Sequence, residues 1–132
     1  MIGEYNWLND YVGIPYKAGG RDESGIDCYG LIKIIYKDCY DIDLPDWLTD
    51  NLNLKQTDRF VREFVCPGNW VPSESPEDGD IAICYGHRLG HHVGVYFGGG
   101  VLHSRDGSGV IYEPVSRFVG QFNQVDFGRW VP

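Results

Sequence analysis

Apolar residues in the first third of the chain recur at helical spacing. Between positions 28 and 38 they fall three and four residues apart, which gathers them on one face of a helix. Asp27 precedes this run, where a carboxylate accepts from the free N–H groups of the first turn. The pattern predicts a helix with Asp27 as N-cap and Cys28 in its first turn. It also predicts a helix from Thr57 to Val65, ended by Cys66-Pro67-Gly68.

The second half of the chain has a different pattern. After the turn residues 76–79, short apolar runs alternate with glycines, which is typical of an antiparallel meander. Helices followed by strands indicate an α+β fold, with the N-terminal helices packed on a C-terminal antiparallel sheet of about five strands. The predicted strands cover residues 80–85, 91–97, 100–104, 109–113 and 126–131.

Length and charge narrow the possibilities. With 132 residues, 42% of them hydrophobic, the chain can fill one core, and we expect a single domain over residues 1–132. The net charge of −8 disfavours nucleic acid as a partner. The start has neither the basic nor the apolar segment of a signal peptide, and no apolar run is long enough to span a membrane. We therefore expect no membrane partner and synthesis in the cytoplasm.

Cys28 stands apart from the other cysteines, Cys39, Cys66 and Cys84, which we interpret as ordinary thiols. It lies where a loop enters a helix, and there the helix dipole and free N–H groups favour a thiolate. Neighbouring N–H groups are also suitable oxyanion donors. Cys28 is thus a candidate nucleophile, with a small buried core residue as the alternative interpretation.

A thiol nucleophile needs a base, and the base needs an orienting group. In a strand, His92 shares a face with Gly94 and Tyr96, opposite the more apolar face of Val93, Val95 and Phe97. A two-residue hairpin at Gly98-Gly99 pairs Phe97 with Gly100. It then sets His103 diagonal to His92, within hydrogen-bonding reach. A three-residue loop would put the two imidazoles on opposite faces.

Other uses of these residue types have weaker support. The chain has no Cys-x-x-Cys or His-x-x-x-His pair that would start a zinc site, and we expect neither metal nor cofactor. Its glycine clusters lack the Lys-Ser/Thr of a phosphate-binding loop. The aromatic residues suit a sugar or peptide groove, although core packing explains each of them more simply.

Several separated segments together resemble the NlpC-type papain-like cell-wall peptidases, and in particular the short versions associated with bacteriophage tails. The similarity runs in the expected order over about residues 11–113. The matching segments are Gly13–Gly20, Gly25–Leu31, Ile42–Pro45, Asp78–Ile81, His92–Tyr96 and Val101–His103.

The resemblance implies a papain-like fold and a cysteine peptidase that hydrolyses an amide bond in peptidoglycan stem peptides, between γ-D-glutamate and the diamino acid. It implies Cys28 as nucleophile, His92 as general base and His103 as its orienting residue. Tyr16 would assist the oxyanion, and Asp27 would contact a substrate amine. Tyr29 replaces the family's usual serine after the cysteine, so we expect it to alter substrate binding.

The resemblance also implies a place of action. A tail-associated enzyme is made in the cytoplasm and delivered by the virion, with tail proteins as its partners. Two alternatives remain open: a tail-tip assembly protein that keeps the fold, and a Cys-His amidase or acyltransferase that acts on another amide.

Overall fold

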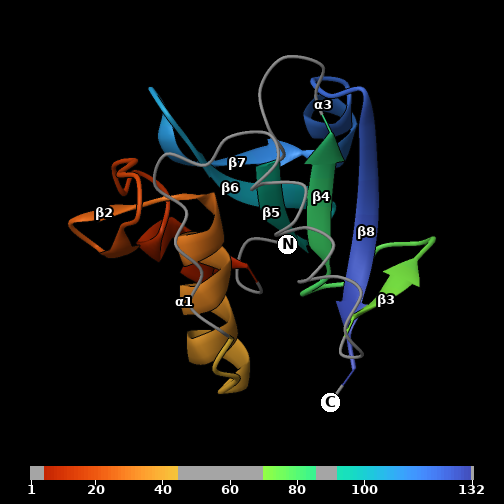
Figure 1. The fold of residues 1–132 in the computed structure, drawn as a ribbon, viewed down its shortest axis with the longest axis horizontal. Helices are drawn as coiled ribbons and strands as arrows, with labels where there is room; N and C mark the ends of the chain where they lie inside the picture. Colours follow the sequence, from red (N-terminus) through yellow and green to blue (C-terminus); the bar gives the residue numbers. More distant parts are fainter. Residues whose placement is uncertain (1–4, 45–69, 86–91, 132) are drawn as a thin grey trace.

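The computed structural model describes residues 5–44, 70–85 and 92–131. A long helix, α1, lies against one face of a six-stranded sheet with the order β3-β8-β4-β5-β6-β7 (Figure 1). All pairings in this sheet are antiparallel. The elements are η1 (Asn6–Asp10), β1 (Arg21–Asp22), β2 (Gly25–Ile26), α1 (Cys28–Tyr40), β3 (Trp70–Ser73), β4 (Ile81–Tyr85), β5 (His92–Phe97), β6 (Gly100–Arg105), β7 (Gly109–Pro114), α3 (Val115–Val119) and β8 (Gln124–Trp130).

The predicted α+β architecture is confirmed, and each of the five predicted strands is present within a few residues of its expected bounds. The sheet has a sixth strand that the pattern did not predict. β3 is four residues long, contains Pro72 and lies at the edge of the sheet, where proline is tolerated. The predicted helix at Thr57–Val65 and Cys66 lie outside the described residues.

The start of α1 forms as the sequence predicts. Asp27 has extended backbone geometry, and its carboxylate accepts from the N–H of Gly30 at 2.7 Å. The helix ends at Asp41, which adopts the left-handed conformation (φ 54°) and donates its N–H to the carbonyl of Lys37. Its apolar face packs on β5 and β6, and the shared core contains Leu31, Ile32, Ile35, Val93, Val95 and Leu102.

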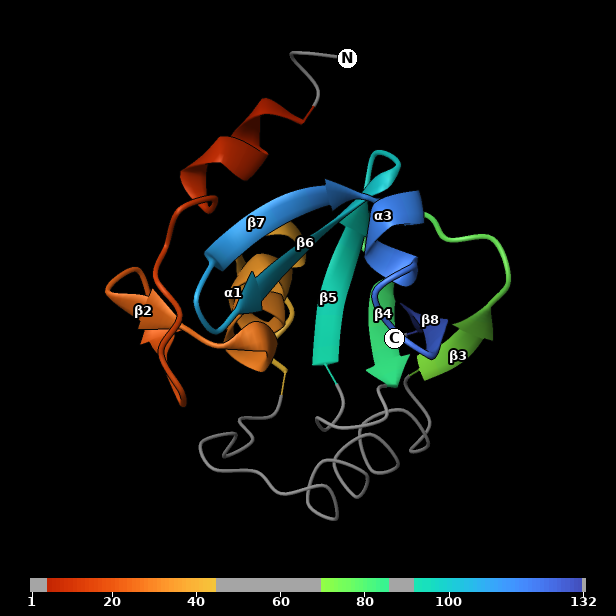
Figure 2. The same cartoon turned by 90° about the horizontal axis from the view of Figure 1, so that it is seen from above.

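The opposite face of the sheet has its own apolar cluster. Alternation along β6 puts Val101 and His103 on this side, away from Leu102. The short helix α3 contacts β6 and β7 here and contributes the fully buried Phe118. Figure 2 shows α1 and α3 on different sides of β5.

The β5–β6 hairpin has the predicted two-residue turn. Gly98 and Gly99 have φ values of 57° and 85°, which only glycine adopts without strain in both positions. Phe97 pairs with Gly100, and Val95 pairs with Leu102. The predicted register is therefore confirmed.

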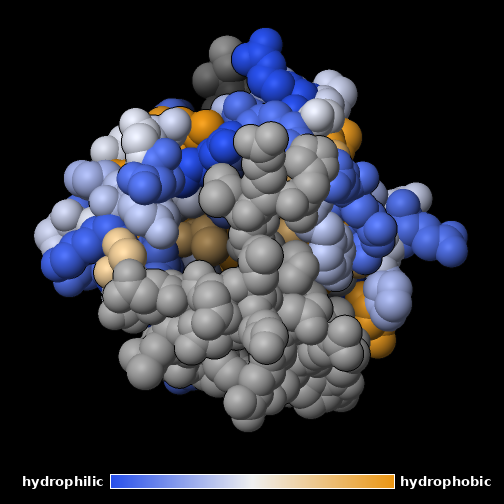
Figure 3. All heavy atoms as spheres, turned by 45° about the horizontal axis from the view of Figure 1, so that its top comes forward, coloured by the Kyte–Doolittle hydropathy of each residue, from blue (hydrophilic) through white to orange (hydrophobic). Residues whose placement is uncertain are grey.

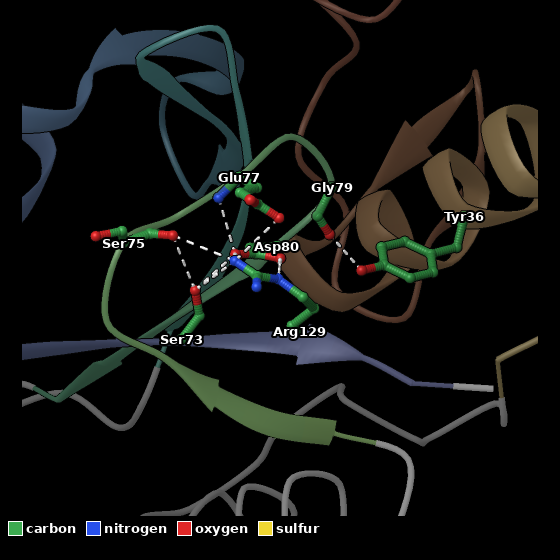
Figure 4. Close-up of polar contacts among 7 residues, drawn as sticks. All are labelled: Tyr36, Ser73, Ser75, Glu77, Gly79, Asp80 and Arg129. Carbon is green, nitrogen blue, oxygen red and sulfur yellow. Dashed lines mark hydrogen bonds and ion pairs between the residues drawn. The ribbon is translucent and has the colours of Figure 1, made fainter.

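A polar cluster ties β3 and the turn before β4 to β8 (Figure 4). Asp80, only 3% exposed, accepts from Nε and Nη2 of Arg129 at 3.1 and 3.0 Å and from the hydroxyl of Ser73 at 2.9 Å. Tyr36 on α1 donates its hydroxyl to the carbonyl of Gly79 in the same turn. These contacts fix the turn against both the sheet and α1.

The large apolar side chains exposed on the described surface are scattered among hydrophilic residues, as the face in Figure 3 shows. None of the helices in the described parts has the length and apolar character needed to cross a bilayer.

Candidate active site

The fold places Cys28 at the junction of α1 and β5. Cys28 is the first residue of α1, and its side chain is partly buried. The backbone N–H of Val93 hydrogen-bonds with the sulfur, as do those of Tyr29 and of Cys28 itself. Because Val93 directly follows His92, these contacts hold the candidate nucleophile at the start of the strand that carries the candidate base.

The acidity of this thiol differs from the prediction. The N–H groups around the sulfur favour the thiolate, as the sequence indicated. Burial outweighs them, and the neighbouring Asp27 carboxylate adds to its effect, so the pKa of Cys28 is raised to about 11. The expectation that the helix start makes Cys28 a thiolate is therefore not met: burial of the sulfur outweighs the N–H groups and favours the protonated thiol.

The two candidate histidines meet as the register requires. Nε2 of His92 lies 2.9 Å from Nδ1 of His103, and the rings meet edge to face. His92 is half-buried, whereas His103 is fully buried. Gly94 opposes His103 on the hairpin, and a Cβ there would come within 2.6 Å of Val101 and 3.1 Å of the Cβ of His103. Glycine at this position lets the two strands approach closely enough for the contact.

Glu113 extends the chain of contacts and was not predicted. Its Oε2 lies 2.8 Å from Nε2 of His103, and it also accepts from the amide nitrogen of Gln121 at 2.9 Å. Burial opposes ionisation of Glu113, but hydrogen bonds from Gln121 and His103 outweigh it and lower the pKa of the carboxyl. The available signal was the β6–β7 register, which pairs Val101 with Glu113 and so puts that carboxylate on the face of His103.

Burial keeps both imidazoles neutral. It lowers the pKa of His92 to about 3, with smaller contributions from His103 and Arg105. Burial also lowers the pKa of His103, although the hydrogen bond and charge of Glu113 act in the opposite direction. A neutral imidazole is the form that can accept a proton, so His92 is suited to act as a base.

Aromatic rings enclose the histidine pair. Phe122 stacks on His92 with ring centroids 5.8 Å apart, and Phe118 meets His103 edge to face at 4.7 Å. Phe118 lies on α3, and Phe122 follows that helix. Neither residue was predicted from the sequence, because the helix α3 was not predicted.

Tyr16 lies near the candidate nucleophile Cys28. It forms an isolated parallel bridge with Ile26, two residues before Cys28. Burial raises the pKa of the Tyr16 hydroxyl, and the charges of Cys28 and Asp27 raise it further. The hydroxyl therefore keeps its proton and is a hydrogen-bond donor next to the thiol.

The side chains of Asp27 and Tyr29 are buried and contact other residues of the protein. Asp27 is 2% exposed, and its carboxylate accepts from the N–H groups of Gly19 and Gly30 and from Arg21. Tyr29 is fully buried, with the Arg21 guanidinium 5.7 Å from its ring centroid. The structure thus brings Cys28 and Tyr16 together but gives Asp27 and Tyr29 almost no exposed surface for a substrate.

The side-chain types around Cys28 and the two histidines define the chemistry that the site can support. Within residues 5–44, 70–85 and 92–131, no three His, Cys, Asp or Glu side chains form a group that would hold a metal ion. The arrangement suits acyl transfer, because the thiol contacts the strand that begins with His92 and a carboxylate-anchored second imidazole lies next to His92.

Comparisons with known proteins identify relatives of this chain. The chain is 28% identical over 103 residues to the murein DD-endopeptidase MepS/murein LD-carboxypeptidase of Escherichia coli (strain K12), covering 77% of this chain and 48% of that protein. It is 31% identical over 98 residues to the murein DD-endopeptidase MepH of the same strain, covering 72% of this chain and 32% of that one. The chain thus spans half or less of these two relatives.

Solved structures share the fold. The NlpC/p60 domain of the peptidoglycan hydrolase SagA matches with a TM-score of 0.60 and 25% identity, over 93% of this chain and 92% of that one. An NlpC/P60 family protein from Bacillus cereus ATCC 10987 matches with a TM-score of 0.65 and 25% identity, over 96% of this chain and 39% of that one. The sequence model of the NlpC/P60 family extends over residues 13–127, and the chain therefore belongs to the NlpC/P60 family.

Proposed function

We propose that this protein is a cysteine peptidase that hydrolyses an amide bond in the stem peptides of peptidoglycan. The observation that carries the proposal is the linked set of His92, His103 and Glu113, joined at 2.9 and 2.8 Å, beside the strand amide that contacts Cys28. The names of the relatives, murein endopeptidases and a peptidoglycan hydrolase, support peptidoglycan as the substrate.

The neutral site defines the order of proton transfers. The Cys28 sulfur attacks the carbonyl carbon while its proton moves to His92, because the thiol is not ionised beforehand. The Tyr16 hydroxyl donates to the oxyanion. His92 then gives its proton to the leaving amine, which leaves a thioester on Cys28. Water transfers a proton to His92 as it attacks the thioester, and the released thiolate takes that proton back.

The bond we propose is the amide between γ-D-glutamate and the diamino acid. The carboxylate of Asp27 is occupied by Gly19, Arg21 and Gly30, which argues against its use as a receptor for a free amine. A stem peptide whose amino end is blocked by the glycan strand is therefore compatible with the site. The names of the MepS and MepH relatives favour the D,D cross-link as the second candidate.

The test is digestion of purified sacculi and of defined muropeptides, with mass spectrometry of the products. We expect wild type and Cys39→Ala, which alters an exposed cysteine, to release the same fragments, and Cys28→Ala to release none. The masses of the fragments distinguish the γ-D-glutamyl bond from the D,D cross-link. Equal release by wild type and Cys28→Ala would refute the proposal.

The place of action is a separate part of the proposal. We propose, from the resemblance of the sequence segments to short tail-associated peptidases alone, that the enzyme is made in the cytoplasm, carried in a phage tail with tail proteins as partners, and used during wall penetration. Mass spectrometry of purified particles, with and without detergent washing, tests this. Absence of the protein from intact particles would refute tail delivery without affecting the peptidase assignment.

A further inference from the structure

Glu113 lies at the end of a hydrogen-bonded chain that reaches the candidate base. His103 is fully buried and uses both ring nitrogens: Nε2 faces Glu113 at 2.8 Å, and Nδ1 faces His92 at 2.9 Å. The Glu113 side chain itself is 17% exposed. No described group other than Glu113 and His92 hydrogen-bonds with this ring.

The position of each proton follows from these contacts. An ionised carboxylate only accepts hydrogen bonds, so Nε2 of His103 must carry a proton. In a neutral imidazole the other nitrogen is then bare, and Nδ1 of His103 accepts from Nε2–H of His92. His92 is thereby left with its lone pair on Nδ1, the nitrogen that does not face His103.

We propose that Glu113 is a positioning residue that sets the tautomers of both histidines, so that His92 presents a basic Nδ1 to the Cys28 thiol. This role rests on the proposed cysteine peptidase function. Without the carboxylate, the proton of His103 can move to Nδ1. His92 Nε2 would then have to accept, and the His92 proton would occupy the nitrogen needed for catalysis.

The surroundings of Glu113 hold it in this role. Arg105 donates to the Oε1 of Gln121, so the amide nitrogen of Gln121 faces Glu113, to which it donates at 2.9 Å, and the carbonyl of Arg117. The side-chain amide thus has a defined orientation. The Gln121 amide gives the Glu113 carboxylate a second donor besides His103, and the two contacts together fix the orientation of the carboxylate.

The charged groups around His92 and His103 shift the pKa values of these imidazoles in opposite directions. Glu113 on β7 raises the pKa of His103, whereas Arg105 on β6 lowers the pKa values of both imidazoles. Cys84 on β4 pairs with His92 in the sheet register and is buried, and burial raises the pKa of its thiol. Burial thus favours the neutral thiol of Cys84, and among the described residues Glu113 is the anionic group in contact with the histidine pair that can stabilise positive charge formed on it.

The experiment compares Glu113→Ala and Glu113→Gln with wild type. A matched control is Glu74→Gln, an exposed carboxylate that follows β3 at the other edge of the sheet. Long-range 1H–15N spectra of the imidazoles report the tautomers directly. We expect Nε2–H on both histidines in wild type and Glu74→Gln, and a loss of this state in Glu113→Ala. Glu113→Gln keeps an acceptor oxygen and should retain part of it.

The rate at which iodoacetamide alkylates Cys28 reports how well His92 removes the thiol proton, and it needs no peptidoglycan. The rate is measured at several pH values from the mass of the peptide that contains Cys28. We expect Glu113→Ala to slow alkylation at neutral pH by about tenfold or more, with Glu113→Gln intermediate. Unchanged tautomers and alkylation in a folded Glu113→Ala variant would overturn the role of Glu113, even if muropeptides are cleaved. If both readouts change and no muropeptide is cleaved by wild type, Glu113 keeps its role and the proposed function fails.

Discussion

Replacement of Asp27 separates a structural role from a substrate-binding one. Its carboxylate accepts from Gly19 N–H at 2.9 Å, Gly30 N–H at 2.7 Å and Arg21 at 2.9 Å, and the residue is 2% exposed. Asp27→Ala removes all three acceptor contacts at once. Asp27→Asn keeps one oxygen but turns an amide N–H₂ group toward the remaining donors.

The cost can be worked out from these contacts. Loss of an N-cap costs about 1 kcal/mol, and an unsatisfied buried N–H, here that of Gly19, about 1–3 kcal/mol. The Arg21 side chain is 22% exposed and can return to water, so we assign it little further cost. The free energy of unfolding should fall by about 2–4 kcal/mol for Asp27→Ala and by roughly half of that for Asp27→Asn.

Urea denaturation with a constant m-value measures this loss, and Asp10→Ala, at an exposed carboxylate in η1, is the control. Kinetics distinguish the two roles. If Asp27 bound a substrate amine, its replacement would raise KM and leave the free energy of unfolding unchanged. Removal of its charge should also lower the pKa of the Cys28 thiol from about 11. A loss below about 0.5 kcal/mol for Asp27→Ala would refute the structural reasoning.

Three further changes test other parts of the structure. Gly94→Ala should cost about 1–3 kcal/mol and reduce muropeptide turnover, because its Cβ would meet Val101 at 2.6 Å; wild-type turnover would contradict the close-approach argument. His92 is held neutral with its pKa near 3, against about 6.5 in the unfolded chain, so the unfolded state binds more protons between these values. His92 should therefore make the free energy of unfolding fall as pH drops from 7 to 4, contributing at most about 1.4 kcal/mol per pH unit, and the fall should be less steep in His92→Gln; equal slopes in urea titrations would exclude this cause. Tyr36→Phe leaves a turn carbonyl without its buried donor and should lower thermal stability by about 1–3 kcal/mol, with no change in the Cys28 alkylation rate.

Features set by neighbouring residues were predictable from the sequence. Asp27 as N-cap and the start of α1 at Cys28 depend on a single turn of backbone. The meeting of His92 and His103 depends on the length of one hairpin, and two adjacent glycines determined it. In each case the residues that interact are close together in the sequence, so a local pattern determines the contact.

Features set by distant segments were not predictable in this way. Glu113 reaches His103 only through the β6–β7 register, and Phe122 reaches His92 only through the path of the chain after α3. The pKa of Cys28 depends on how much protein surrounds the sulfur. The helix start supplies N–H groups, as predicted, but a sequence pattern does not give the burial that opposes them.

The histidine chain and the partly buried thiol have a common consequence for catalysis. Burial raises the pKa of Cys28 and lowers that of His92, so both effects oppose a thiolate–imidazolium pair in the free protein. The nucleophile must then lose its proton during attack, and a base in the wrong tautomer has no lone pair to receive it. The reaction thus depends on one lone pair, that of Nδ1 of His92, rather than on a preformed ion pair. Because Glu113 sets the tautomer of His92 through His103, the carboxylate becomes a condition for catalysis at Cys28.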